Sequence, residues 1–194
     1  AVIVARNVSG HMASFPIVEM VFHRQKNMLD YLFAPADVDE ATRIEADRIA
    51  RKTARLTGVV GLLAVEMFVT PQGEILVNEL APRPHNSGHH TIEANLTSQF
   101  EQHLRAILDL PLGLPDMRSP AVMVNLVGDR GSEGPPRYDG LEEILGRPQV
   151  HIHCYGKHIT RPFRKMGHVT VIHDDIRTAK RIAADVKKKV RVRT

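Results

Sequence analysis

Two glutamates, Glu66 and Glu79, flank the segment of this sequence that most clearly predicts a functional site. They lie in a run of β-forming residues, 65–79, that is interrupted by a Pro-Gln-Gly turn signal typical of a hairpin. If the turn centres on Gln72 and Gly73, Glu66 and Glu79 lie directly opposite each other on one face. Facing carboxylates repel each other unless a cation lies between them, and magnesium prefers such oxygen ligands. The spacing therefore predicts a magnesium site; the alternatives are a carboxylate that faces solvent or a register that differs by one residue.

An irregular loop at 80–91 follows the second of these strands and carries one arginine and three histidines. The guanidinium of Arg83 can clamp a planar oxyanion through two hydrogen bonds. Such a loop beside a metal-binding hairpin predicts one wall of a site for anions. His85, His89 and His90 could instead form a transition-metal cluster, although their spacing matches no zinc signature and no cysteine is nearby.

The sequence VNELAPRPHNSGHHT at 77–91 resembles the signature of the 5-(carboxyamino)imidazole ribonucleotide synthases, which are ATP-grasp enzymes of purine biosynthesis and the ATPase subunit of phosphoribosylaminoimidazole carboxylase. Further similar segments lie at 4–7, 15–19, 68–73, 98–106, 155–157 and 164–168, so the resemblance covers nearly the whole chain. It implies an α+β fold, in which the C-terminal part of an ATP-grasp domain is followed by a small β-rich domain closed by one helix. It also implies a homodimer.

The resemblance implies a reaction in which ATP phosphorylates bicarbonate and the exocyclic amine of 5-aminoimidazole ribonucleotide captures the activated carboxyl group. ATP and Mg²⁺ are the expected cofactors, and charge neutralisation and positioning are the expected sources of catalysis. Arg83 and His85 are the candidate catalytic residues, because they could hold bicarbonate or carboxyphosphate near the amine.

The resemblance also implies which residues bind the nucleotide and its metal. Glu66 and Glu79 would bind the magnesium ions that bridge the ATP phosphates, and Asn78 would lie beside them in the nucleotide site. Strict alternation along a strand places Asn78 on the opposite face from Glu79, so its role requires a bulge or a strand end. His23 follows the position of a nucleotide-contacting histidine, although the sequence at 19–23 carries one extra residue relative to the family.

A second basic segment, at 157–165, lies between two predicted strands and contains Lys157, Arg161, Arg164 and Lys165. A loop rich in lysine and arginine is usually just solvated, but cations gathered in a short loop can also clamp a phosphate. In the family, the equivalents of Lys157 and Arg164 hold the 5′-phosphate of the ribonucleotide. The resemblance therefore implies that Lys157, Arg164 and Lys165 bind the substrate.

The nearest rival function is that of formate-dependent glycinamide ribonucleotide transformylase, another ATP-grasp enzyme with a similar Pro-Arg-Pro-His loop. The rival resembles His-Asp-Thr-Gly after this motif, whereas this chain has Asn-Ser-Gly-His at 86–89, which favours the carboxylating family.

A rival of another class is a basic nucleic-acid-binding module, because residues 176–194 hold eight lysines or arginines and one acid. The same segment has an apolar stripe at helical spacing, formed by Ile176, Ala179, Ala183, Val186 and Val190. The stripe favours a packed helix whose charges form the solvated face. We therefore do not expect nucleic acid to be a partner.

Composition excludes several other classes of protein. The 194 residues are 43% hydrophobic and 25% charged, which is ordinary for a globular protein and excludes a disordered chain or a fibre. The apolar stretch near Leu62 is interrupted by Glu66, far short of the ~20 residues that span a membrane. A single cysteine, Cys154, and the lack of a signal-peptide pattern predict a cytoplasmic protein.

The expected elements follow from local signals. Strands are predicted at 1–6, 12–19, 121–127, 149–155 and 168–172. Asp37 and Ser98 each precede a glutamate by three residues, which predicts helices that begin there, one ending at Gly58 and the other at Pro111. In the second helix, an apolar face is formed by Phe100, Leu104, Ile107 and Leu108.

The Pro-rich segment at 111–120 predicts a linker, and we expect one domain at 1–115 and a second at 116–194. The chain opens on a buried-strand pattern, Ala1–Ala5, without an initiator methionine. A first strand needs a neighbour to pair with, so we expect this chain to be the back part of a longer protein.

Overall fold

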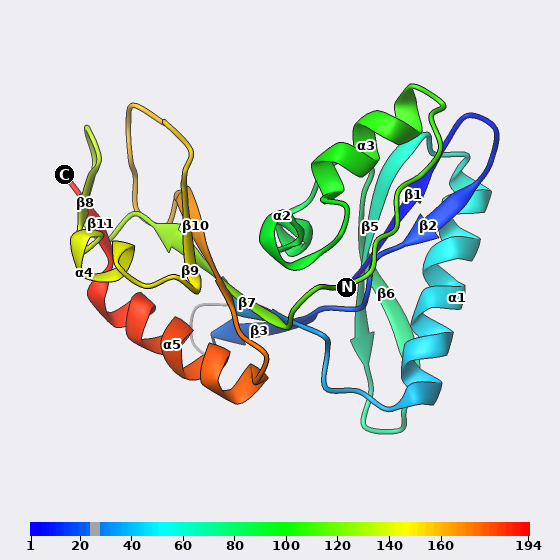
Figure 1. Cartoon of the computed structure of the whole chain (residues 1–194), viewed down its shortest axis with the longest axis horizontal. Coiled ribbons are helices and arrows are strands. Elements are labelled where there is room, and N and C mark those ends of the chain that lie inside the picture. Colours follow the sequence, from blue (N-terminus) through cyan, green and yellow to red (C-terminus); the bar gives the residue numbers. More distant parts are fainter. Residues whose placement is uncertain (24–27) are drawn as a thin grey trace. The chain divides into compact units, whose positions relative to one another are not determined.

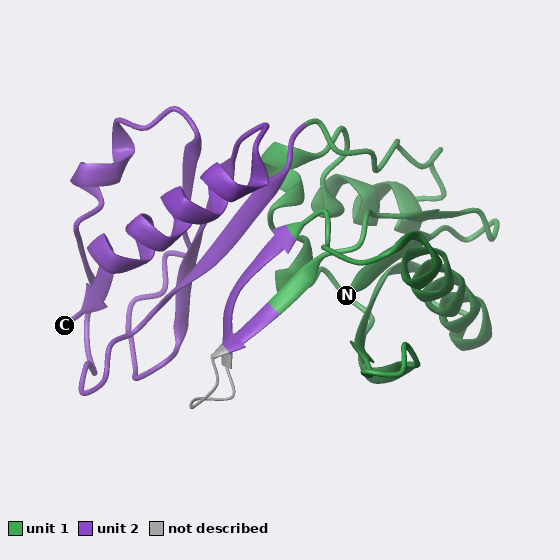
Figure 2. Cartoon of the chain, turned by 90° about the horizontal axis from the view of Figure 1, so that it is seen from below, with its two compact units in different colours: residues 1–20, 34–118 green, residues 21–33, 119–194 purple. Residues whose placement is uncertain are grey.

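The computed structural model of this chain describes residues 1–23 and 28–194. The chain forms two compact units, Ala1–Met20 with Ala34–Arg118 and Val21–Phe33 with Ser119–Thr194 (Figure 2). The division after Arg118 lies close to the boundary expected after residue 115. Val21–Phe33, however, was expected in the first domain and groups with the second unit, because its strands belong to the sheet of that unit.

The first unit is built on one antiparallel sheet in the order β2-β1-β5-β6. Its strands are β1 (Val2–Arg6), β2 (Met12–Ser14), β5 (Gly61–Val69) and β6 (Ile75–Ala81). One face packs against α1 (Glu40–Thr57) through Val4, Leu63 and the buried alanines of the helix. The other face is covered by α3 (Gln99–Ile107) and the segment around it, including the short α2 (Thr91–Ala94) (Figure 1).

The two longer helices of this unit, α1 and α3, begin at side-chain N-caps. The α1 helix ends at Gly58, whose φ of 65° is left-handed, but its N-cap is Asp39 rather than Asp37, since the Asp39 side chain accepts from the backbone N–H of Thr42. In α3, Ser98 accepts from the backbone N–H of Glu101, which confirms the predicted N-cap. The Glu101 carboxylate accepts from Arg105 instead of closing the expected capping box.

The buried face of α3 is not the predicted apolar one. Leu104 is 56% exposed and Phe100, Ile107 and Leu108 are also exposed, whereas Gln99 and Gln102 are fully buried. The glutamines are buried because their amides bond neighbouring loops: Gln102 donates to the Gly113 carbonyl at 2.7 Å and accepts from its N–H at 2.8 Å. Two satisfied amides therefore decide which way this helix faces.

The second unit is a five-stranded sheet in the order β3-β4-β7-β10-β9. Its strands are β3 (Glu19–His23), β4 (Met28–Ala34), β7 (Ala121–Val127), β10 (Lys165–Ile172) and β9 (Val150–Cys154). The strands predicted at 121–127 and 149–155 are confirmed, and the one predicted at 168–172 is present but already begins at Lys165. The predicted strand at 12–19 is wrong in extent, because β2 ends at Ser14 and β3 begins at Glu19.

The long helix α5 (Ile176–Lys189) covers one face of this sheet, and its predicted stripe is confirmed, since Ala179, Ala183 and Val186 are buried in the core. A small ladder of β8 (Arg137–Asp139) with β11 (Arg191–Arg193) and the short α4 (Glu142–Leu145) complete the unit. None of the helices in the described residues combines the length and apolar character needed to traverse a bilayer.

Candidate active site

The β5–β6 hairpin places Glu66 directly opposite Glu79, as the sequence predicts. The predicted centre of the turn is wrong, however. The Thr70 N–H donates to the Glu74 carbonyl at 2.9 Å, so the turn centres on Gln72 alone, and Met67 pairs with Val77. A register shift between Glu66 and Met67 then restores the expected pairing.

Asn78 is the extra residue at this register shift, because Val77 and Glu79 each have a partner on β5 and Asn78 lies between them. A bulge breaks the strict alternation of side chains along a strand. The bulge that a nucleotide-contacting role for Asn78 requires is therefore present, and the amide is exposed.

The glutamate pair lies on the sheet face opposite α1. Glu66 shares its face with Leu62 and Ala64, which pack in the cluster on the α3 side, whereas Leu63 and Val65 pack against α1. The Glu66 side chain is only 16% exposed, while Glu79 is open to solvent. The two carboxylates therefore lie at the boundary between the part of this sheet face that is covered and the part that is exposed to solvent.

His85 lies beside Glu66, with its Nε2 at 3.5 Å from Glu66 Oε1. It precedes the 3₁₀ turn Asn86–Gly88, and its Nδ1 accepts from the backbone N–H of Ser87 at 3.3 Å. An Nδ1 that accepts this bond leaves the proton of the neutral ring on Nε2, toward the carboxylate. The structure thus brings a histidine of the loop onto the hairpin.

Gln99 holds this loop in place, a role that sequence reasoning missed. Its Oε1 accepts from the His85 N–H at 2.9 Å, and its Nε2 donates to the His85 carbonyl at 2.8 Å and to His89 Nδ1 at 2.8 Å. The only signal in the sequence is a polar residue directly after the Ser98 cap, which is common on exposed helix starts.

The three histidines of the loop have different partners. His89 stacks on Phe100 with ring centroids 5.6 Å apart, while His90 is buried and its Nδ1 lies 3.1 Å from the Ser87 carbonyl. Burial lowers the pKa of His90 to about 4. Within the described residues, no group of three or more His, Cys, Asp or Glu side chains could hold a metal ion, so the zinc alternative gains no support.

The donor set of the hairpin fits magnesium instead. Magnesium is usually held by one or two carboxylates, with its remaining positions filled by water and substrate phosphates. Glu66 and Glu79 supply two carboxylates on one face, at a surface that solvent reaches. Arg83 follows the hairpin in an exposed position, where its Nη1 donates to the Pro84 carbonyl at 3.1 Å.

The predicted substrate-binding residues lie in the second unit, at the β9–β10 connection. The Lys157 Nζ donates to the Lys165 carbonyl at 2.6 Å, and Arg164 Nη1 donates to the Ile159 carbonyl at 2.6 Å. Arg164 and Lys165 are exposed. The structure therefore gathers Lys157, Arg164 and Lys165 at one connection of the second unit.

Tyr155 is a second residue that sequence reasoning missed. The Lys157 ammonium lies 5.4 Å from the centroid of its ring, and its hydroxyl lies 3.0 Å from His168 Nδ1. Burial raises the pKa of Tyr155 to about 12, so the hydroxyl keeps its proton at neutral pH. The side chain of His23, predicted to contact the nucleotide, lies outside the described residues.

Two domain families match this chain. Residues 1–100 match the ATP-grasp domain, and residues 121–182 match the phosphoribosylaminoimidazole carboxylase C-terminal domain. The chain is 47% identical over 172 residues to the N5-carboxyaminoimidazole ribonucleotide synthase of Bacillus subtilis, which covers 88% of this chain and 43% of that protein. It is 40% identical over 177 residues to the phosphoribosylaminoimidazole carboxylase of Saccharomyces cerevisiae, covering 89% of this chain and 30% of that protein.

Solved structures agree with these relatives. The N5-carboxyaminoimidazole ribonucleotide synthetase of Thermotoga maritima superimposes with a TM-score of 0.92 at 49% identity, over 100% of this chain and 52% of that one. The N5-carboxyaminoimidazole synthase of Aspergillus clavatus, in complex with ADP and 5-aminoimidazole ribonucleotide, gives a TM-score of 0.84 at 35% identity, over 97% and 51%. The chain thus spans between about a third and a half of the length of the relatives that it matches. It belongs to the ATP-grasp family and is similar, over almost its whole length, to the N5-carboxyaminoimidazole ribonucleotide synthases.

Proposed function

We propose that the protein to which this chain belongs carboxylates 5-aminoimidazole ribonucleotide with bicarbonate at the expense of ATP, a step of purine biosynthesis. The observation that carries this proposal is the facing pair of Glu66 and Glu79, with Asn78 in a bulge and His85 against Glu66. The similarity to enzymes named for this reaction supports it.

In this proposal the hairpin would hold a magnesium ion. Glu66 and Glu79 would be its protein ligands, the ion would supply positive charge that neutralises the ATP phosphates, and the Asn78 amide would contact the nucleotide from the bulge. The position of His85 at 3.5 Å from Glu66 orients that carboxylate from the loop side. His23 is proposed to contact the nucleotide as well.

Arg83 and His85 are proposed to bind bicarbonate and the carboxyphosphate formed from it. A bicarbonate oxygen attacks the γ-phosphorus and ADP leaves; the amine of the ribonucleotide then attacks the carboxyl carbon and phosphate leaves. Arg83 offers a planar pair of donors to these oxyanions, and its exposed position leaves the guanidinium free to reach them. Replacing Arg83 by alanine should abolish carboxylation in an enzyme of full family length.

Lys157, Arg164 and Lys165 are proposed to bind the 5′-phosphate of the ribonucleotide. Their shared place in the β9–β10 connection supports this role, because a phosphate with several oxygens can be bound by several cations of one short segment. Replacing Lys157 by alanine should raise KM for the ribonucleotide and leave KM for ATP unchanged.

We further propose a homodimer in the cytoplasm. The free thiol of Cys154 suits a reducing compartment, and light scattering of the purified protein tests the dimer.

The formate-using rival is separated from this function by one assay. ADP release is measured with an enzyme of full family length and 5-aminoimidazole ribonucleotide, or with glycinamide ribonucleotide for the rival. We expect release that depends on bicarbonate and 5-aminoimidazole ribonucleotide together. Release that depends on formate and glycinamide ribonucleotide would overturn the proposal in favour of the rival.

A further inference from the structure

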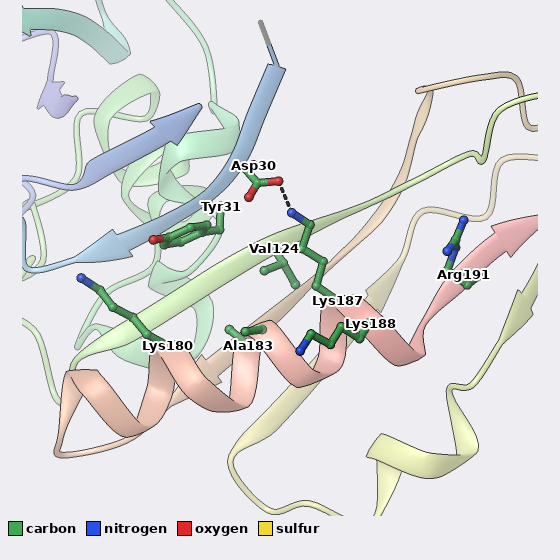
Figure 3. A pocket seen from close by; sticks show the side chains of 9 residues that line it. Asp30, Tyr31, Val124, Lys180, Ala183, Lys187, Lys188 and Arg191 are labelled. Atoms are coloured by element: carbon green, nitrogen blue, oxygen red, sulfur yellow. Dashed lines mark hydrogen bonds and ion pairs between the residues drawn. The ribbon is translucent and has the colours of Figure 1, made fainter. Parts of the chain in front are cut away.

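The second unit contains a cavity of about 560 Å³ between β4, β7 and α5 (Figure 3). Its volume lies within the range of ordinary small-molecule sites, which is about 300–1,000 Å³. None of the proposed catalytic, metal-binding or substrate-binding residues lines it. The proposed function therefore assigns no role to this cavity.

The floor of this cavity is apolar. Val124 on β7 and Ala183 on α5 are each only 2% exposed, and their side chains face the open space. The ring of Tyr31 on β4 forms one side and stacks on Phe33, with ring centroids 6.3 Å apart. A flat apolar or aromatic group would find partners on this floor.

The rim of the cavity is basic. Four of the eight lysines and arginines of residues 176–194 line it: Lys180, Lys187, Lys188 and Arg191. The three lysines lie on one side of α5, and Arg191 is the first residue of β11, directly after this helix. All four line the same cavity (Figure 3). The sequence predicts that the basic residues of this segment form a solvated face, and in the structure half of them line the cavity.

Acidic residues balance only part of this charge. Lys187 pairs with Asp30, and Arg191 Nη2 lies 2.9 Å from Asp129. The Lys180 ammonium lies 3.3 Å from the centroid of the Phe33 ring. Lys188 lies near Asp185, but that carboxylate also pairs with Arg147 and Lys189. The cations around the cavity therefore outnumber the carboxylates that face them, and this excess of positive charge favours an anion.

We propose that this cavity binds a nucleoside monophosphate, with the base on the floor formed by Tyr31, Val124 and Ala183 and the phosphate toward Lys188. The combination of an aromatic floor with a basic rim matches a ligand that has a planar body and a terminal dianion. The confined volume favours a mononucleotide over a nucleic-acid strand, which needs an extended basic groove. This site shares no residue with the proposed nucleotide site on the β5–β6 hairpin.

The test is an NMR titration of this chain with adenosine 5′-monophosphate, adenosine and inorganic phosphate. We expect the monophosphate to shift the resonances of Tyr31, Val124 and Ala183, and to bind at least about tenfold more tightly than adenosine or phosphate. The Glu79→Gln variant separates the two sites, because it alters only the hairpin and should leave these shifts unchanged.

Matched charge reversals on α5 locate the phosphate. Lys188→Glu should weaken binding of the monophosphate about tenfold or more, since it replaces a cation of the rim by an anion. Arg181→Glu changes the same charge at an exposed position of the same helix that does not line the cavity, and should leave affinity within about twofold. Lys180→Gln, which removes one rim charge without reversal, should also weaken binding.

Three outcomes would overturn the proposal. They are an absence of shifts at Tyr31 and Ala183, an equal loss of affinity in Lys188→Glu and Arg181→Glu, and displacement of the monophosphate by a single-stranded oligonucleotide that binds more tightly. The second outcome would mean unspecific attraction to a basic helix. The third outcome would mean that the basic segment at 176–194 binds nucleic acid, as in the rival interpretation of the sequence.

Discussion

Glu66 and Glu79 are direct partners across the β5–β6 ladder, and Asn78 is the residue by which the two halves of that ladder differ in register. Near the turn the numbers of paired residues sum to one less than they do at the glutamates, since Met67 pairs with Val77. A turn centred on the single residue Gln72 would not by itself place Glu66 opposite Glu79. The bulge at Asn78 shifts the register by one residue and so brings the two glutamates opposite each other.

The facing pair predicts weak magnesium binding by this chain and tight binding only with ATP in an enzyme of full family length, because the nucleotide phosphates supply ligands that the hairpin lacks. Glu79→Gln should remove the ATP-dependent binding and leave the fold intact, since it deletes one of two repelling charges. Isothermal titration of magnesium with and without ATP measures this. Glu74→Gln, in the exposed turn of the same hairpin, is the control and should change neither affinity.

Deleting Asn78 should remove the bulge and keep the glutamate pair. Residues 75–77 and 79–81 already pair with β5 on either side of it, so the deletion joins two segments that are both in register. Cross-strand NOEs between the Cα protons of residues 66 and 79 test this. We expect the deletion variant to keep the pairing and lose affinity for ATP, and a pairing that slips would refute the register described here.

Local signals made part of this arrangement predictable from the sequence. The hairpin, the Ser98 cap and the α5 stripe each depend on residues within a few positions of one another. The β3–β4 pair was not predicted, because β4 finds its place beside β7, about ninety residues further along the chain.

The orientation of α3 and the role of Gln99 could not be predicted from such local signals. Hydrophobic periodicity points to Phe100 and Leu104 as the buried side. The side chains of Gln99 and Gln102 instead bond loops that lie 14 and 11 residues away in the sequence, and these bonds bury the polar side. In the candidate active site, the facing glutamates were predictable, whereas the contact of His85 with Glu66 depends on how the loop folds back.

Replacing Gln99 by alanine should lower the free energy of unfolding by about 3 kcal/mol, because it leaves the N–H and carbonyl of His85 without these partners. Gln102→Ala is the matched control, since it breaks a similar pair of bonds to Gly113. Urea unfolding should show a similar loss in both variants. Turnover under folding conditions should fall in Gln99→Ala alone, and an equal fall in both would contradict a role in positioning His85.

The buried His90 predicts a pH dependence of stability. Its pKa is lowered from 6.5 to about 4 by burial, so the folded state takes up this proton at lower pH than the unfolded chain does. The neutral form of His90 therefore adds to the free energy of unfolding above pH 6.5. This contribution, about 3 kcal/mol, is lost as the pH falls toward 4.

His90→Asn isolates this contribution, because the amide can still donate to the Ser87 carbonyl but does not titrate. Urea unfolding of both proteins at pH 7 and pH 4.5 should show that the wild-type protein loses more stability than the variant. A difference between the two proteins that does not change with pH would contradict this account of His90.

The most direct measurement for the proposed function follows oxygen from bicarbonate to phosphate. An enzyme of full family length is supplied with ATP, magnesium, 5-aminoimidazole ribonucleotide and ¹⁸O-labelled bicarbonate, and the phosphate is analysed by mass spectrometry before the label exchanges with water. Because a bicarbonate oxygen attacks the γ-phosphorus and leaves with the phosphate, we predict one labelled oxygen in each phosphate released. Turnover that releases unlabelled phosphate would contradict the account.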